Sequence, residues 1–231
     1  MKGQAAAVIC AAGSSRRMGG LKKEYLLLEP GLTVLGAAVK AFAARTRICL
    51  LVIVTPPGDE DERLARECLP PELLPDYTEK PLFFVPGGPT RRVSVHNALS
   101  FLSSHNPSCV LIHDGARPWV DADLIERTID AALRFGAVTP VLPLIETPKE
   151  LDEKGFVRRH LKRAQVGTAQ TPQGFAFPAI LRAHEMAAVR EINDHIDYTD
   201  DAEVWGEFMG PVAVIPGSQA NRKITFPGDL R

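Results

Sequence analysis

Five apolar runs show no alternation between apolar and polar positions, and this feature constrains the fold more than any other. A strand with one face in water alternates the two kinds of residue, whereas a strand covered on both faces is apolar throughout. Strands of the second kind occur mainly in parallel sheets with helices on either side. The sequence therefore predicts an α/β fold with a mostly parallel central sheet and helices on both faces. The runs start at Ala5, Ile48, Leu82, Ser108 and Ala137.

Segments with helical periodicity separate these runs, as a parallel sheet requires. Residues 121–136 begin with an acid and end with a glycine, which are the residue types that helix ends favour. Further helices are predicted within residues 32–45, 59–71, 90–104, 177–190 and 200–208, and a last strand within 211–217.

Composition limits the possible functions. The 231 residues suffice for one large α/β domain, and we expect a single domain over residues 1–231. Because the net charge is -1, the chain is not a polycation that binds nucleic acid, and anions must bind at local clusters. No apolar run approaches the ~20 residues that span a bilayer. The apolar start is interpreted as a first strand, with a signal peptide as the minor alternative.

Four cysteines are spread along the chain without close pairs or zinc spacing. Three of them lie in strand-like runs, so we expect buried thiols in the reduced state. This usage favours a cytoplasmic location, and the lack of a long apolar run predicts no membrane partner. The residues are Cys10, Cys49, Cys68 and Cys109.

The pattern breaks over residues 143–163, which are polar, charged and weakly periodic. A Lys154-Gly155 turn lies there between two possible short strands. We predict a protruding β-hairpin arm inserted in the domain.

The first strand runs into a loop of small residues with four cations, Arg16, Arg17, Lys22 and Lys23. The loop matches neither phosphate-binding glycine motif, G-x-x-x-x-G-K-[ST] or G-x-G-x-x-G. Small residues nevertheless let backbone N–H groups approach phosphate oxygens, and the cations neutralise their charge. A phosphate chain is therefore expected here, with Lys23 in a solvent-facing loop; the alternative is a solvated basic turn.

A second cluster, "HDGARP", follows the strand from Ser108. In open α/β sheets, ligands bind beyond the carboxyl ends of strands. Asp114 could hold a magnesium ion or a ribose hydroxyl, or else form an ion pair with Arg117 that fixes the loop. His113 is expected to be a packing residue rather than a base.

A third cluster, "PGGPTRRVSVHNAL", places a Gly-Gly turn before a helix with Arg91, Arg92 and Ser94 in its first turn. The free N–H groups of a helix start can bind an anion or a base edge. The alternative is ordinary capping by Thr90.

Three later segments carry little information alone. They are "AQTPQGF", "DYTDDAEVW" and "GSQANRKITFPGDL". In the second, Thr199 is expected to cap a helix whose first turn holds Asp200 and Asp201.

Together and in this order, the segments resemble the 2-C-methyl-D-erythritol 4-phosphate cytidylyltransferases, over nearly the whole chain. The motifs on which the resemblance rests are "AAGSSRRMG…KKEYLLL", "GGPTRRVSVHNAL", "HDGARPWV", "AQTPQGF", "YTDDAEV" and "GSQANRKITFPGDL". The resemblance implies a Rossmann-like nucleotide-diphospho-sugar transferase fold and a nucleotidyltransferase. Its reaction joins CTP and 2-C-methyl-D-erythritol 4-phosphate, with magnesium, and releases pyrophosphate in non-mevalonate isoprenoid precursor synthesis.

The resemblance also implies roles for matching residues. Arg17 and Lys23 stabilise charge on the phosphates in the transition state. The nucleotide is contacted by Ala11, Ala12, Gly13, Gly88, Ser94, Asp114 and Gly115.

On the side of the second substrate, Asp114 and Arg117 lie near the metal, the ribose and the polyol phosphate. Lys223 positions the attacking phosphate. The hairpin resembles a dimerisation arm that reaches over the neighbouring subunit's site, so that Thr147 and Arg163 bind the polyol phosphate across a homodimer.

Several positions depart from the family pattern. Ser15 and Gly115 replace a usual glycine and alanine, Pro148 follows Thr147 in the arm, and Val166-Gly167 replaces a usual Leu-Trp. The chain also stops at "PGDLR", where members normally continue into a last helix. Because most departures lie near the arm, a ribitol 5-phosphate cytidylyltransferase stays open as an alternative. A catalytically silent nucleotide-binding protein is disfavoured, since the matched charged positions are all present.

Overall fold

An eight-stranded sheet forms the centre of the molecule, in the strand order β10-β7-β11-β6-β1-β4-β5 with β12 paired to β7. The computed structural model describes residues 4–13, 19, 22–56, 58, 62–74, 80–194 and 196–230. The strands are β1 (Ala5–Cys10), β4 (Ile48–Thr55), β5 (Leu82–Pro86), β6 (Cys109–Asp114), β7 (Ala137–Pro143), β10 (Gly167–Ala169), β11 (Gln173–Ala176) and β12 (Ala213–Pro216).

The core of the sheet is parallel, as the apolar runs predict. β1 lies in the middle and pairs in parallel with both β4 and β6, while β5 pairs in parallel with β4. β11 is antiparallel to both β6 and β7, and β10 is antiparallel to β7. The sheet is therefore mixed, and the carboxyl ends of β1, β4, β5 and β6 lie along one edge.

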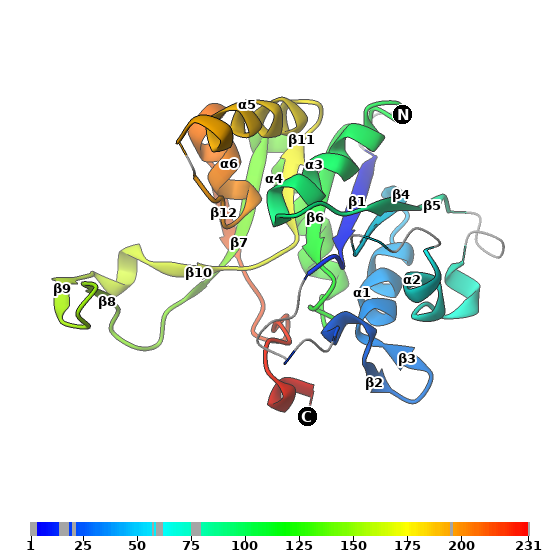
Figure 1. Cartoon of the computed structure of the whole chain (residues 1–231), viewed down its shortest axis with the longest axis horizontal. Coiled ribbons are helices and arrows are strands. Elements are labelled where there is room, and N and C mark those ends of the chain that lie inside the picture. The colour runs from blue at the N-terminus through cyan, green and yellow to red at the C-terminus, as the bar shows by residue number, and fades with distance from the viewer. Residues whose placement is uncertain are drawn as a thin grey trace.

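Helices cover both faces of this sheet (Figure 1). Leu35, Phe42 and Leu124 pack on one face with alternate residues of β1, and Leu99 and Ile180 pack on the other with the remaining residues. The helices are α1 (Val34–Ala43), α2 (Arg63–Glu67), α3 (Arg91–Leu102), α4 (Ala122–Phe135), α5 (Ala179–Asp194) and α6 (Asp201–Phe208).

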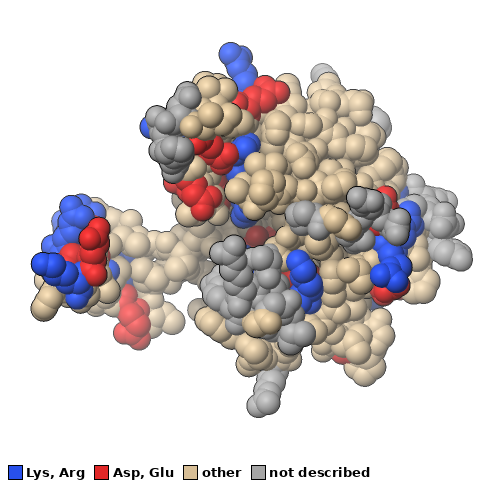
Figure 2. Space-filling view, in the orientation of Figure 1, with Lys and Arg blue, Asp and Glu red and all other residues tan. Residues whose placement is uncertain are grey.

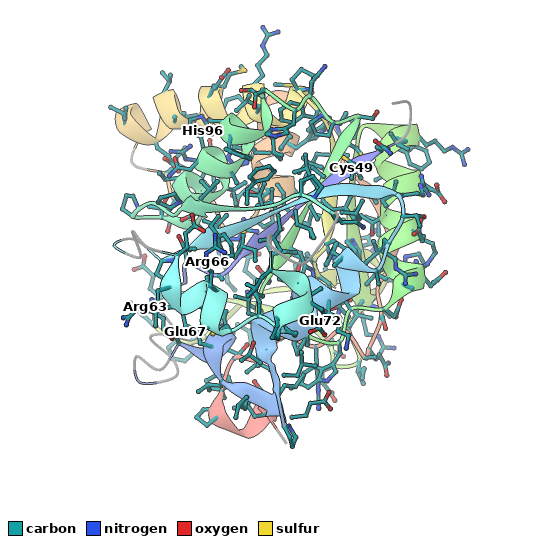
Figure 3. All side chains as sticks on the ribbon, turned by 90° about the vertical axis from the view of Figure 1, so that its right-hand side faces the viewer. Cys49, Arg63, Arg66, Glu67, Glu72 and His96 are labelled. Atoms are coloured by element: carbon teal, nitrogen blue, oxygen red, sulfur yellow. The ribbon has the colours of Figure 1, made fainter. Side chains whose placement is uncertain are left out.

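The α2 helix lies beside the β5 edge, as Figure 3 shows with Arg63, Arg66 and Glu67 labelled. The Arg66 guanidinium lies 5.0 Å from the centre of the Phe84 ring. A guanidinium over an aromatic face is an attractive contact. It ties the short helix to the edge strand.

Helix boundaries follow the expected caps with one correction. Asp121 accepts a hydrogen bond from Leu124 N at 2.7 Å, and Gly136, whose φ is 85°, caps the C-terminal end of α4. The cap of α6 is Asp200, which accepts from Glu203 N at 2.8 Å, so the prediction that Thr199 caps this helix is wrong. Thr199 instead donates its hydroxyl to the Glu203 carboxylate.

Residues 143–163, for which the sequence predicts a hairpin, contain the two-stranded antiparallel sheet of β8 (Lys149–Leu151) and β9 (Val157–His160). The turn between the strands includes Gly155, whose φ of 83° favours glycine. Figure 1 shows this segment, called the arm below, extending away from the main sheet. Figure 2 shows Lys and Arg side chains gathered at its outer end, with Asp and Glu side chains beside them.

The remaining short elements lie at the periphery. They are η2 (Lys23–Tyr25), β2 (Leu27–Glu29), β3 (Leu32–Thr33), η3 (Pro71–Leu73), η4 (Arg163–Gln165) and η5 (Pro227–Leu230). The four cysteines are free thiols; Cys68 and Cys109 are buried as expected, whereas Cys10 and Cys49 are only half-buried. Within the described part of the chain, no helix combines the length and apolarity needed to cross a membrane.

Candidate active site

The loops that follow β1, β4, β5 and β6 are joined directly at the carboxyl edge of the sheet. Ala11 N donates to Val54 O at 3.0 Å, and Gly87 N donates to Thr55 O at 2.9 Å. Gly115 N donates to Cys10 O, also at 2.9 Å. The segments predicted to contact a nucleotide are thereby held side by side.

Gly87 allows two of these loops to touch. A Cβ added at Gly87 would lie 2.6 Å from the Ala12 Cβ and 2.8 Å from Thr55 O. Both distances are closer than real Cβ contacts, so any side chain here would push the loop away. The close approach keeps the Gly-Gly turn against the end of β1.

Ser94 fastens the same turn to the start of α3. Its hydroxyl oxygen accepts from Gly88 N at 3.0 Å, and its hydroxyl donates to Thr90 O at 2.8 Å. Thr90 caps α3 by accepting from Val93 N at 3.2 Å, so the capping alternative is realised. These hydrogen bonds fix the turn relative to the start of α3.

Asp114 ends β6 inside a group of cations. Its carboxylate lies 2.8 Å from Lys223 Nζ and 3.3 Å from Arg117 Nε. Burial alone would raise the pKa of this carboxyl, but Lys223, Arg91 and Arg117 outweigh burial and hold the pKa well below its usual range. The expected Asp114–Arg117 ion pair is present, and the site holds a permanent negative charge with three cations around it.

His113 is fully buried beneath Asp114 and acts as a packing and hydrogen-bonding residue, as expected. Its Nε2–H donates to Arg117 O at 3.1 Å, and its Nδ1 accepts from the Thr171 hydroxyl at 3.1 Å. The Thr171 oxygen in turn accepts from Asp114 N at 3.0 Å. Burial lowers the pKa of His113 to about 4, so the ring is neutral and fixes the turn after β6.

The C-terminal segment reaches this edge through contacts that sequence spacing does not indicate. Arg117 Nη1 donates to Asn221 O at 2.8 Å, and Ile224 N donates to Ala116 O at 2.9 Å. Gln170 Nε2 donates to both Ser218 O and Asn221 O. These bonds set the position of Lys223 opposite Asp114. They also show that "AQTPQGF" and "NRKIT" are in direct contact at this edge.

The basic loop after β1 is placed only in part. Arg17 lies outside the described residues. Lys22 Nζ donates to Gly13 O at 3.1 Å, which holds the described end of the loop. Lys23 belongs to η2 and its side chain is buried, with an exposed fraction of 9%. The expectation of a solvent-facing loop is therefore wrong for Lys23, because the short helix packs it against the body.

Thr147 and Arg163 both belong to the arm and are exposed. Arg163 Nη1 donates to Ile145 O at 2.7 Å, which braces the base of the arm. The strands β8 and β9 of the arm extend away from the main sheet, in which Asp114 ends β6 (Figure 1).

One pair at the edge was missed by the sequence analysis as a functional feature. Arg91 Nη2 lies 2.7 Å from the buried carboxylate of Asp201. The signal was available in the paired acids of "YTDDAEV", but helix capping gave a sufficient local reason for them.

Metal binding by protein groups alone is not supported in the part of the chain that the structure describes. No group of three or more His, Cys, Asp or Glu side chains there could hold an ion. Asp114 can still offer one carboxylate. Magnesium commonly binds through one or two carboxylates, with substrate phosphates and water completing its shell.

Comparison with known proteins gives consistent matches. Residues 5–231 match the model of the IspD family, 2-C-methyl-D-erythritol 4-phosphate cytidylyltransferase. The bifunctional enzyme IspD/IspF of Rhodopseudomonas palustris strain HaA2 is 40% identical over 97% of this chain and 53% of its own length. The 2-C-methyl-D-erythritol 4-phosphate cytidylyltransferase of Pelotomaculum thermopropionicum is 36% identical over 97% of this chain and 90% of its own.

The fold agrees with these matches. The crystal structure of 4-diphosphocytidyl-2C-methyl-D-erythritol synthase from Anaerococcus prevotii has a TM-score of 0.82 and 28% identity, covering 99% of this chain and 93% of that one. The chain spans about half the length of the first curated relatives it matches, which are bifunctional. A family model that extends over nearly every residue decides the assignment. The chain belongs to the 2-C-methyl-D-erythritol 4-phosphate cytidylyltransferase family.

Proposed function

We propose that this chain transfers a cytidylyl group from CTP to 2-C-methyl-D-erythritol 4-phosphate. The products are 4-diphosphocytidyl-2-C-methyl-D-erythritol and pyrophosphate, in the non-mevalonate route to isoprenoid precursors. The observation that carries the proposal is the meeting of Asp114, Arg117 and Lys223 beside the Gly-Gly turn and the end of β1. Residues from four separate segments thus meet at one edge, as a two-substrate transfer requires.

The nucleotide side of the site is assigned to backbone groups and small residues. Ala11, Ala12 and Gly13 approach the phosphates, while Gly88 and the Ser94 region read the cytosine and ribose. Gly115 and the Asp114 carboxylate complete this side. The close packing of Gly87 on Ala12 supports the assignment, because it leaves backbone rather than bulky side chains at the edge.

Transfer needs no covalent enzyme intermediate. A phosphate oxygen of the polyol phosphate attacks the α-phosphorus of CTP, and the bond from that phosphorus to the oxygen of the departing pyrophosphate breaks. The nucleophile is already anionic, so the reaction needs no general base. Catalysis then rests on placement and on neutralising charge that develops on the phosphates. Arg17 and Lys23 are proposed to supply that neutralisation.

Lys223 is proposed to position the attacking phosphate. It pairs with Asp114 at 2.8 Å, yet its side chain is 35% exposed, so a phosphate can share it. Arg117 stays fixed by Asp114 and Asn221 O and keeps the local charge balanced. A divalent cation such as magnesium would be held by Asp114 and mainly by the CTP phosphates. It would supply further neutralisation of the leaving pyrophosphate.

A homodimer is proposed to complete the polyol site. The arm displays exposed apolar side chains, including Ile145 at 77% and Phe156 at 70% exposure. Exposed apolar side chains grouped on one projection favour contact with another protein surface. In a dimer, Thr147 and Arg163 of one subunit would reach the Lys223 region of the other. A cytoplasmic location remains a prediction from cysteine usage.

The direct test follows pyrophosphate release from CTP and magnesium, with methylerythritol 4-phosphate and ribitol 5-phosphate in parallel. We expect release with the first substrate and little with the second. Release with ribitol 5-phosphate alone would keep the transfer chemistry and overturn the substrate. No pyrophosphate release with either substrate would contradict the proposed function.

The ribitol alternative is tested in parallel for a structural reason. A Cβ at Gly167 of β10 would lie 2.2 Å from Val141 Cγ1 and 2.9 Å from Leu142 O. β10 therefore pairs with β7 in a way that the family's usual large residue would disturb. This difference lies at the root of the arm, where the polyol phosphate is proposed to bind.

A further inference from the structure

Asp201 is a buried carboxylate that the proposed chemistry does not use. It is the first residue of α6, and its side chain is only 1% exposed. An ionised carboxylate at such depth is tolerated only when cations or hydrogen-bond donors compensate it. Asp201 lies 2.7 Å from Arg91 Nη2 of α3 and 3.3 Å from His184 Nε2 of α5. One carboxylate thus joins three helices.

Arg91 connects this carboxylate to the carboxyl edge of the sheet. It is the first residue of α3, three positions after Gly88, and its side chain is 28% exposed. Arg91 is also close enough to Asp114 to help lower the pKa of that carboxyl, second to Lys223. Burial alone would lower the pKa of Arg91, but Asp201, together with Cys10 and Asp114, outweighs burial and raises the pKa, so the guanidinium stays charged.

We propose that Asp201 is a positioning residue of the nucleotide site that acts through Arg91. The ion pair fixes the start of α3, and with it the turn that Ser94 holds by Gly88 N. It also holds a positive charge beside the end of β6. This inference rests on the proposed use of CTP. It assigns Asp201, the second acid of "YTDDAEV", a role in the site that helix capping does not explain.

A second buried ion pair provides a matched control. Arg92 Nε lies 2.6 Å from the Glu191 carboxylate, with side chains 6% and 18% exposed. This pair also joins α3 to α5, so breaking it weakens the same layer of helices. Because it does not include Arg91, it separates loss of stability from loss of nucleotide positioning.

The test measures CTP binding by calorimetry with magnesium and without polyol phosphate. Asp201→Asn should raise the Kd for CTP about tenfold or more, since it removes the negative charge that holds Arg91 in place. Glu191→Gln should stay within about twofold of wild type, although both variants lower the melting temperature. At saturating CTP, the KM for methylerythritol 4-phosphate should be unchanged in Asp201→Asn.

Arg91→Lys is the second variant and covers the case in which Asp201→Asn does not fold. Lysine keeps the charge but loses the planar fork, so this variant should bind CTP more weakly than wild type by a smaller factor. Wild-type affinity in the folded variants, or equal losses in Asp201→Asn and Glu191→Gln, would overturn the inference alone. Failure of the wild-type protein to bind CTP would overturn the proposed function and the inference together.

Discussion

At the scale of single residues, His113 shows how the site depends on a neutral group below it. The ring is buried, donates to Arg117 O and accepts from the Thr171 hydroxyl. A proton on Nδ1 would remove the acceptor to which the Thr171 hydroxyl donates. The geometry and the lowered pKa of His113, about 4, thus agree on the neutral form.

We predict a stability loss at mildly acidic pH that belongs to His113. Its pKa is lowered from 6.5 to about 4 by burial, so below pH 6.5 the unfolded chain takes up the proton first. Stability is therefore complete above pH 6.5 and falls as the pH drops towards 4, by about 2 kcal/mol at pH 5. Urea unfolding of wild type and His113→Gln at pH 7.5 and pH 5 measures this difference.

His113→Gln is suited to the comparison because its amide can both donate and accept in place of the ring. The variant should be less stable than wild type at pH 7.5 but should lose less stability between the two pH values. Parallel losses in the two proteins would show that other groups cause the acid sensitivity.

At the scale of elements, the arm is proposed to act on the site of a neighbouring subunit. Arg163 is anchored to Ile145 O at the base of the arm, whereas Lys223 belongs to the C-terminal segment at the carboxyl edge. If the arm serves a neighbouring subunit, each site takes Lys223 from one chain and Arg163 from the other.

This arrangement predicts recovery of activity by mixing two inactive variants, Arg163→Ala and Lys223→Ala. After subunit exchange, half of the dimers are mixed and each has one intact site, so turnover should recover to about a quarter of wild type in a two-fold symmetric dimer. Each variant incubated alone is the control. The arrangement in trans would be contradicted if mixing restored no activity. It would also be contradicted if light scattering showed a monomer that is fully active.

Elements also differ in how well the sequence predicts them. Long segments with clear periodicity, such as the α4 helix and the apolar strand β4, agree with prediction because one pattern repeats over several turns or residues. The strands β10 and β11 were not predicted, since segments of three or four residues are too short to show a period. Thr199 and Asp200 were both suitable caps, and the choice between them depends on the tertiary position of α6.

At the scale of the whole molecule, the order of motifs predicts which residues meet at the site. It does not predict the contacts that hold them there. The apolar runs place Asp114 and the Gly-Gly turn at one edge, because parallel strands share their carboxyl ends. The position of Lys223 depends on Gln170 and Asn221, which are far from Asp114 in sequence. The burial of Lys23 likewise arises from the packing of η2, which no local pattern indicates.

The most direct measurement uses CTP with radioactive phosphorus at the α-position and asks which product carries the label. The full chain is incubated with this CTP, magnesium and methylerythritol 4-phosphate, and products are separated by chromatography. The proposed transfer predicts label in the polyol product and none in pyrophosphate. Lys23→Met keeps an unbranched side chain of similar length at this buried position but removes the charge, so this variant should fold and slow the transfer by about 100-fold or more. Label that stays in CTP or appears in CMP alone, with the wild-type protein folded, would contradict cytidylyl transfer by this chain.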